Sequence, residues 1–268
     1  MTPEAAWMAP ASVDEALALK AERKDAVPIQ GGTDVMVELN FDRSRPETIL
    51  NLNEVGELRG WGRDNGTLRL GSGLTYAEAM GNGVASVLPA LAEASRTVGS
   101  PQIRNRGTLG GNLGTASPAG DALPPLLVYE AEVVIASAAR GVRVVPVARF
   151  LTGPKQNALL ADELIVAVRL EPRGMRQTFM KVGPRNAMVI AVVSLCLAVD
   201  READEIRVSY GSAGPKPGLV RVGLGNIWEL ADLVARDASP IDDVRGTAAY
   251  RVHALKVLVG RALKRCLT

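Results

Sequence analysis

The sequence predicts an α+β protein in two parts. Before Glu171 the patterns of helix and strand alternate along the chain, whereas after Gly174 three strand patterns are followed by two helix patterns. Between the two parts, the segment Glu171-Pro-Arg-Gly174 interrupts the pattern with proline and glycine. A chain of 268 residues is long enough for two domains of ordinary size. We therefore expect a first domain over 1–172 and a smaller α+β domain over 173–268.

Composition and charge narrow the class of protein. Hydrophobic residues make up 47% and charged residues 22% of the chain, as is usual for a folded globular protein. The net charge of +2 gives no support for nucleic-acid binding, and no apolar run reaches the length of a membrane span. The amino-terminal residues lack the pattern of a signal peptide, and Cys196 and Cys266 are the only cysteines. We therefore expect a cytoplasmic protein without a disulfide framework.

Capping and turn signals locate the elements of the first part. Ser12 followed by Glu15 is a capping box that opens a helix, and Thr75 can cap a second helix over 76–80. Apolar residues at helical spacing predict one longer helix over 84–98. The other elements expected here are strands over 27–30, 48–52, 67–70, 132–137, 143–146 and 163–170, and helices over 35–39 and 123–129. In the second part we expect strands over 176–183, 188–199 and 205–210, then helices over 226–237 and 246–266.

The segment 95–125 has the most unusual composition in the chain. It is rich in glycine, small hydroxyl residues and proline, although apolar patterning continues on both sides of it. This composition predicts an ordered loop, whose glycines let the backbone approach another group closely. Short polar side chains accompany the glycines: Asn112, Thr115, Ser117 and Asp121. A bound phosphate or sugar explains the combination, and the alternative is a loop that packs only on itself.

A second glycine-rich segment, 29–34, joins a predicted strand to a helical segment. Consecutive amides at such a junction can face an anion. Neither GxGxxG nor GxxxxGK[ST] occurs there, which argues against a Rossmann domain and against a nucleoside triphosphatase. Taken alone, Gly31-Gly-Thr-Asp34 is also compatible with a plain tight turn.

These segments belong to a longer series of strings that occur in one order along the chain. The series begins with Gly31-Gly-Thr-Asp34, Gln102-Ile-Arg-Asn-Arg-Gly-Thr-Leu-Gly-Gly-Asn112 and Ala116-Ser-Pro-Ala-Gly-Asp121. It continues with Asp162-Glu-Leu-Ile165, Phe179-Met-Lys181, Arg185-Asn-Ala-Met-Val-Ile-Ala191 and Asp243-Val-Arg-Gly-Thr-Ala-Ala-Tyr-Arg251. In this order the strings resemble the FAD-binding subunit of the molybdenum hydroxylases, the group of bacterial xanthine dehydrogenases, carbon monoxide dehydrogenases and aromatic-heterocycle hydroxylases. Their residues are most similar to those of the xanthine dehydrogenase branch.

The resemblance implies a fold and a set of cofactor contacts. The fold is a vanillyl-alcohol-oxidase-type FAD-binding domain of two α/β lobes, 1–55 and 56–172, followed by a small α+β domain. Residues 28–35 would supply amides to the diphosphate, and residues 108–112 would lie close to the flavin and its ribityl chain. The cofactor-binding residues implied are Pro28, Ile29, Gln30, Gly31, Gly32, Thr33, Asp34, Val35, Thr108, Leu109, Gly110, Gly111, Asn112, Ser117, Asp121, Ile165 and Lys181.

Four of these residues have individual roles in the resemblance. Asp121 would contact polar groups of FAD, with Ser117 nearby, and Ile165 would pack against the adenine end. Lys181 would stabilise the negative charge that develops at N1/O2 of the flavin on reduction.

The implied function is electron transfer within a heterotrimer. The subunit would take electrons from [2Fe-2S] centres on a partner and pass them to NAD+ or another acceptor, so no catalytic side chain is expected. Two distant cysteines cannot supply the four thiolates of an iron–sulfur cluster. We therefore expect no metal on this chain, and molybdopterin and [2Fe-2S] only on partner subunits. The alternatives are a stand-alone FAD-dependent reductase of the same fold and a flavin-free assembly or scaffold subunit.

Two features leave further alternatives open. Arg104 and Arg106 could reach a phosphate or a partner subunit, or could anchor the chain through backbone carbonyls. The segment 215–228 is shorter and less regular than in the family, which bears on partner docking and on packing of the second domain. The substrate hydroxylated by the complex would be bound by another chain.

Overall fold

A small parallel sheet opens the structure. In the computed structural model, which describes residues 5–268, the strand order of this sheet is β1-β3-β2. Parallel neighbours need crossover connections, which helices α1 and α2 provide. The elements are β1 (Ala6–Met8), α1 (Val13–Glu22), β2 (Val27–Ile29), α2 (Val35–Asn40) and β3 (Thr48–Asn51). Ser12 caps α1 as predicted, because its hydroxyl accepts a hydrogen bond of 3.2 Å from the amide of Glu15.

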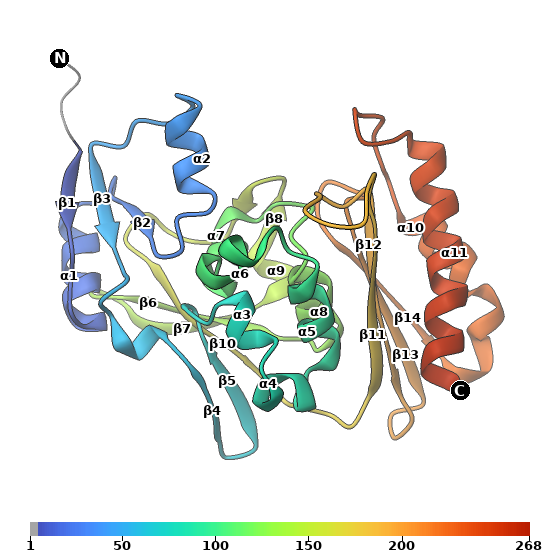
Figure 1. Cartoon of the computed structure of the whole chain (residues 1–268). Coiled ribbons are helices and arrows are strands. Elements are labelled where there is room, and N and C mark those ends of the chain that lie inside the picture. The colour runs from blue at the N-terminus through green and yellow to red at the C-terminus, as the bar shows by residue number, and fades with distance from the viewer. Residues whose placement is uncertain (1–4) are drawn as a thin grey trace.

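A five-stranded antiparallel sheet follows, in the order β4-β5-β10-β6-β7. Its strands are β4 (Trp61–Asp64), β5 (Thr67–Gly71), β6 (Glu132–Ser137), β7 (Gly141–Pro146) and β10 (Leu164–Leu170), and the short helix η1 (Gly56–Leu58) precedes them. All residues of the central strand β10 except Arg169 are buried. Figure 1 shows this sheet between the first sheet and the helical middle of the molecule.

Short helices fill the space between the second and third sheets (Figure 1). They are α3 (Tyr76–Ala79), α4 (Asn82–Val87), α5 (Pro89–Arg96), α6 (Pro101–Arg106), α7 (Leu109–Thr115), α8 (Leu123–Val128) and α9 (Val147–Phe150), with the hairpin β8 (Leu151–Gly153) and β9 (Gln156–Asn157) at their edge. The predicted single helix over 84–98 is wrong. The helix is interrupted at Leu88, which precedes Pro89 and has non-helical backbone angles of φ −125° and ψ 61°.

The prediction of a loop over 95–125 is also wrong, because α6, α7 and the start of α8 lie within it. Glycine lowers helix propensity, but side-chain caps compensate for it here. Ser100 accepts a hydrogen bond from the amide of Ile103, and Thr108 accepts one from the amide of Gly111. Helix α7 ends at Ala116, whose left-handed φ of 47° cannot continue a helix.

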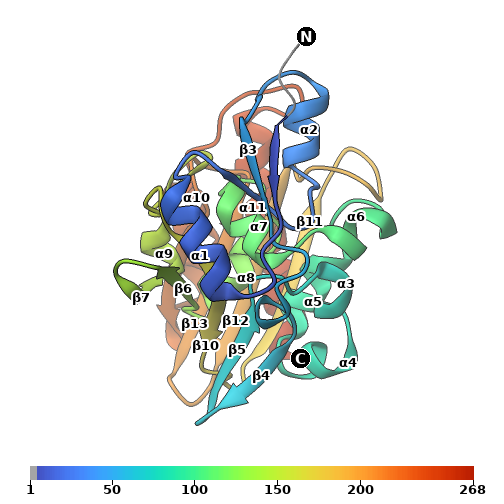
Figure 2. The same cartoon turned by 90° about the vertical axis from the view of Figure 1, so that its left-hand side faces the viewer.

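The third sheet is antiparallel, in the order β11-β12-β13-β14, and is followed by two helices. Its elements are β11 (Arg176–Val182), β12 (Val193–Asp200), β13 (Glu205–Gly211), β14 (Gly218–Gly223), η2 (Leu224–Glu229), α10 (Leu230–Asp237) and α11 (Ala248–Leu267). Two expectations are corrected. The strand predicted over 188–199 begins only at Val193, and the segment 215–228 contains the regular strand β14, which is held by pairing with β13. Seen from the amino-terminal side, α10 and α11 lie at the back of the molecule (Figure 2).

The hydrophobic core crosses the predicted domain boundary. Phe179, Cys196 and Ala198 of the third sheet belong to the same buried cluster as Leu91 of α5 and Leu123 of α8. The opposite face of that sheet packs in a second cluster with α10 and α11. The arrangement of helices and strands confirms the α+β class, and the division at 172/173 stays a prediction. None of the helices in the described part of the chain has the length and apolarity needed to cross a lipid bilayer.

Candidate cofactor site

A cavity of about 310 Å³ lies between strand β2, helix α7 and the start of β10. Residues 27–35 form its first wall. The second wall consists of Ser72, Thr108, Gly110, Gly111, Gly114 and Thr115. The third consists of Leu159, Glu163, Leu164 and Ile165, and Leu52 also contributes. Two segments that are more than seventy positions apart in the chain, both rich in glycine, therefore face one space.

The first wall carries free backbone donors. Within the described part of the chain, none of the N–H groups of residues 31–35 donates a hydrogen bond to another residue, whereas the amide of Met36 donates to the oxygen of Gly32 at 2.9 Å. Gly32 adopts φ +73°, a left-handed conformation that glycine accepts without strain. Successive free amides are suited to an anion such as a diphosphate. We call residues 31–35 the amide segment.

Helix α7 offers no comparable set of donors. The amide of Leu109 donates to the oxygen of Leu74 at 3.0 Å, and that of Gly110 donates to the oxygen of Ser72 at 2.7 Å. The amide of Gly111 donates to Oγ1 of Thr108 at 3.0 Å. The amino-terminal amides of this helix are therefore used within the protein.

Two of the glycines allow protein elements to approach one another. A Cβ atom at Gly110 would lie 2.7 Å from the Cβ and the carbonyl oxygen of Ser72, and one at Gly31 would overlap the carbonyl oxygen of Arg106. Glycine is thus required at both positions for close packing of the walls. Both glycines also line the cavity, and their contact with a cofactor stays a prediction.

The structure brings twelve of the predicted cofactor-binding residues to the cavity: Pro28, Ile29, Gln30, Gly31, Gly32, Thr33, Asp34, Val35, Thr108, Gly110, Gly111 and Ile165. Thr115 and Asp34 also join the two walls, since Oγ1 of Thr115 donates to Oδ2 of Asp34 at 2.8 Å. The remaining five, Leu109, Asn112, Ser117, Asp121 and Lys181, are absent from the cavity lining. Their contact with a cofactor stays a prediction.

Three of these five occupy distinct places around α7. The side chain of Leu109 is wholly buried in the main hydrophobic cluster. Oγ of Ser117 accepts a hydrogen bond of 3.3 Å from the amide of Ala119. Asn112 lies against Gly120, and its buried Oδ1 has no hydrogen-bond partner among the described residues.

Asp121 and Lys181 form a buried ion pair with an N–O distance of 2.5 Å. Their side chains are 7% and 6% exposed, respectively. Lys181 also donates to the carbonyl oxygen of Thr97 at 3.1 Å. Burial raises the pKa of the Asp121 carboxyl, and the charge of Lys181 opposes that effect. The pair joins the first part of the chain to the third sheet.

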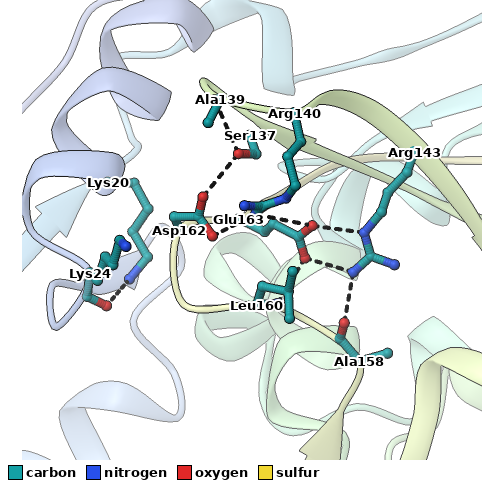
Figure 3. Close-up of polar contacts among 10 residues, drawn as sticks. All are labelled: Lys20, Lys24, Ser137, Ala139, Arg140, Arg143, Ala158, Leu160, Asp162 and Glu163. Atoms are coloured by element: carbon teal, nitrogen blue, oxygen red, sulfur yellow. Dashed lines mark hydrogen bonds and ion pairs between the residues drawn. The ribbon is translucent and has the colours of Figure 1, made fainter.

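Glu163 fixes the third wall (Figure 3). Its carboxylate accepts two hydrogen bonds from Arg143, at 2.7 and 2.6 Å, and one from the amide of Leu160 at 2.7 Å. Arg143 also donates to the carbonyl oxygen of Ala158 at 2.7 Å. The hydrogen bonds from Arg143 lower the pKa of Glu163. This network holds the segment 158–163, which carries Leu159 to the cavity.

The neighbouring carboxylate, Asp162, shares Arg140 with Glu163, whose Oε1 lies 3.6 Å from that guanidinium (Figure 3). It accepts hydrogen bonds from Arg140 at 2.5 Å and from Oγ of Ser137 at 3.1 Å. The Arg140 guanidinium lowers the pKa of Asp162 to about 2. Asp162 does not line the cavity.

The sequence did not identify several of the lining residues, and it left the roles of Arg104 and Arg106 undecided. Ser72 had one signal, because it lies between two glycines directly after a predicted strand. Glu163 had a second kind of signal, since it lies in the string Asp162-Glu-Leu-Ile165 that carries the resemblance. Leu159 had none, because only tertiary packing brings it to the cavity. Arg104 donates to the oxygens of Val98 and Gly99, and Arg106 donates to that of Gln30. Both arginines thus anchor the chain through backbone carbonyls.

Comparisons of the sequence with known proteins point to one family. Residues 3–172 match the family described as "FAD binding domain in molybdopterin dehydrogenase". The chain is 29% identical to the xanthine dehydrogenase FAD-binding subunit of Escherichia coli O157:H7, over 94% of this chain and 92% of that protein. It is 35% identical to caffeine dehydrogenase subunit beta of Pseudomonas sp. (strain CBB1), over 79% of this chain and 74% of that protein.

The fold also matches a solved structure. Carbon monoxide dehydrogenase from Hydrogenophaga pseudoflava superimposes with a TM-score of 0.91 at 25% identity, over 100% of this chain and 98% of that one. The agreement over the full chain includes the third sheet and its two helices, which lie beyond the residues matched by the family.

Proposed function

The chain belongs to the family of FAD-binding domains of molybdopterin dehydrogenases, and from this premise we propose that it is the electron-transfer subunit of a molybdenum hydroxylase. FAD is its cofactor. The observation that carries the proposal is the cavity itself, in which the amide segment and the glycines of α7 face each other. When bound, FAD supplies redox chemistry that no side chain of the protein can perform.

The residues of the cavity fit part of an FAD molecule. The amide segment supplies donors for the diphosphate, and the apolar side chains of Ile29, Leu52 and Ile165 suit an aromatic ring. An FAD molecule is larger than a cavity of about 310 Å³, so another part of it would lie outside. We propose that the predicted residues beyond the lining serve that part.

The Asp121–Lys181 pair is suited to such a role. An ammonium group has three donors, of which Lys181 uses one for Asp121 and one for the oxygen of Thr97. Oδ1 of Asp121 is buried and has no partner among the described residues. The pair thus retains one donor and one acceptor, which a ring edge such as the pyrimidine edge of a flavin can use.

The names of the relatives support a proposal for the partners, and the electron acceptor is part of the same proposal. The proteins that it resembles are subunits of dehydrogenases. We propose that [2Fe-2S] centres on one partner deliver electrons, that a second partner holds the molybdenum cofactor, and that NAD+ is the acceptor. The two cysteines, both free and buried, favour the cytoplasm as the compartment.

The proposal is tested by titrating the purified chain with FAD and following flavin fluorescence. We expect saturable binding of one FAD, and NADH formation when partner subunits, their substrate and NAD+ are added. A chain that assembles with its partners but takes up no FAD would be a scaffold. A chain that turns over with FAD in the absence of partners would be a stand-alone reductase. Either result contradicts the proposal.

A further inference from the structure

Ser72 is held in the cavity wall by its own backbone. It follows strand β5 directly, and its amide donates to the oxygen of Val166 in β10 at 3.1 Å. Its carbonyl oxygen accepts from the amide of Gly110 in α7 at 2.7 Å. Both backbone groups of Ser72 are therefore committed to neighbouring elements, which leaves the side chain as its only group for a ligand.

The hydroxyl of Ser72 has no partner. The residue is 3% exposed, and its Oγ makes no hydrogen bond to any described residue. Buried hydroxyls are normally paired, because water can no longer bond to them. Of the described residues with unpaired buried hydroxyls, which are Thr48, Ser72, Ser194, Ser209 and Ser212, only Ser72 lines the cavity.

The wall around Ser72 is shaped by its two glycine neighbours. A Cβ at Gly71 would collide with the carbonyl oxygen of Leu58, and one at Gly73 would collide with the side chain of Gln30. Gln30 is itself in the first wall of the cavity. Gly73 therefore allows the segment of Ser72, which lies in the second wall, to pack closely against Gln30 of the first wall.

We infer that Ser72 is a cofactor-binding residue whose hydroxyl hydrogen-bonds to a polar group of FAD. The inference rests on the proposed function and adds a contact to it. A hydroxyl is both donor and acceptor, so it can pair with a phosphate or ribose oxygen or with a ring nitrogen. A hydrogen bond to FAD would give this buried hydroxyl the partner that it lacks among the described residues.

The test compares Ser72→Ala with Ser209→Ala. Ser209 is a matched control, because it is equally buried, its hydroxyl is equally unpaired, and it lies in β13 away from the cavity. Each protein is freed of cofactor and titrated with FAD, and the melting temperature of the cofactor-free form is recorded. We expect Ser72→Ala to raise the Kd for FAD roughly 2- to 10-fold, the effect of one lost hydrogen bond. Neither substitution should lower the melting temperature, since each removes an unpaired polar atom.

The outcomes separate this inference from the proposed function. If the wild-type chain does not bind FAD, the proposed function fails before the variants are compared. If wild type binds FAD and Ser72→Ala binds it with the same Kd, the inference about Ser72 alone is overturned. An equal loss of affinity in both variants also overturns it, because the effect would then come from altered packing.

Discussion

The side chain of Glu163 holds one wall of the cavity in place. Its carboxylate is 1% exposed and bonds to Arg143 and to the amide of Leu160, so it holds three chain segments together. We expect Glu163→Gln to lower the free energy of unfolding near neutral pH by about 1–2 kcal/mol, since Arg143 is partly exposed and solvent weakens the pair. Urea unfolding measures this value, with the exposed Glu54→Gln as control.

The same substitution should change the dependence of stability on pH. The pKa of Glu163 in the folded protein lies below its ordinary value of 4.5. Its contribution is therefore fully present above pH 4.5 and is lost as the pH falls through the folded pKa. Unfolding measured at decreasing pH should show a shallower acid loss in Glu163→Gln than in wild type. Parallel curves would show that the Arg143–Glu163 pair contributes nothing.

At the scale of elements, close packing between the amide segment and α7 demands glycine. Gly31→Ala and Gly110→Ala each place a Cβ against backbone, so we expect each to destabilise the protein by about 1–3 kcal/mol. Gly62→Ala is the control, because a Cβ there meets no atom within 4 Å. It should change the free energy of unfolding by less than about 0.5 kcal/mol. Thermal denaturation of the cofactor-free proteins checks all three, and a tolerated Gly31→Ala would mean that the two walls can separate.

Local signals were sufficient for some elements and insufficient for others. The caps at Ser12 and Thr75 are formed by residues within one turn, so the sequence predicts them correctly. Helix α7 was missed because its glycines are stabilised by a cap and by packing against Ser72, which no local pattern reveals. Strand β14 was missed because its pairing with β13 outweighs its weak pattern.

Part of the site could also be predicted from the sequence, and part of it could not. Residues 28–35 lie together in the cavity as expected, since they are continuous in the chain. Leu159 reaches the same cavity in a segment that the Arg143–Glu163 network holds, so its place depends on tertiary structure.

At the scale of the whole molecule, Asp121 and Lys181 connect the two predicted domains. Removing one member leaves the other charge buried, so we expect Lys181→Met to cost about 3–5 kcal/mol of stability. The double variant Lys181→Met/Asp121→Asn should recover a large part of this loss, because no buried charge remains. Chemical unfolding of the two single variants and the double variant measures the coupling. An additive result would show that the pair does not act as a unit.

The continuous core predicts that the two domains unfold together. Phe179 and Cys196 share one cluster with residues of α5 and α8, so separating the domains would expose apolar surface on both sides. We expect calorimetry to show a single transition whose van't Hoff and calorimetric enthalpies agree. Two resolved transitions would mean that the boundary at 172/173 divides independent folding units.

Helix α2 contributes no residue to the hydrophobic clusters, and this affects how fast FAD can enter and leave the cavity. None of its residues is buried. The Asp34–Thr115 hydrogen bond links its amino-terminal end to α7, and the exposed pair Glu38–Lys155 links it to the β8–β9 hairpin. Both links can open without disturbing the hydrophobic clusters, so the cavity has a side that admits a large molecule at low cost. Thr115→Val should therefore accelerate both association and dissociation of FAD in stopped-flow measurements, while their ratio changes little.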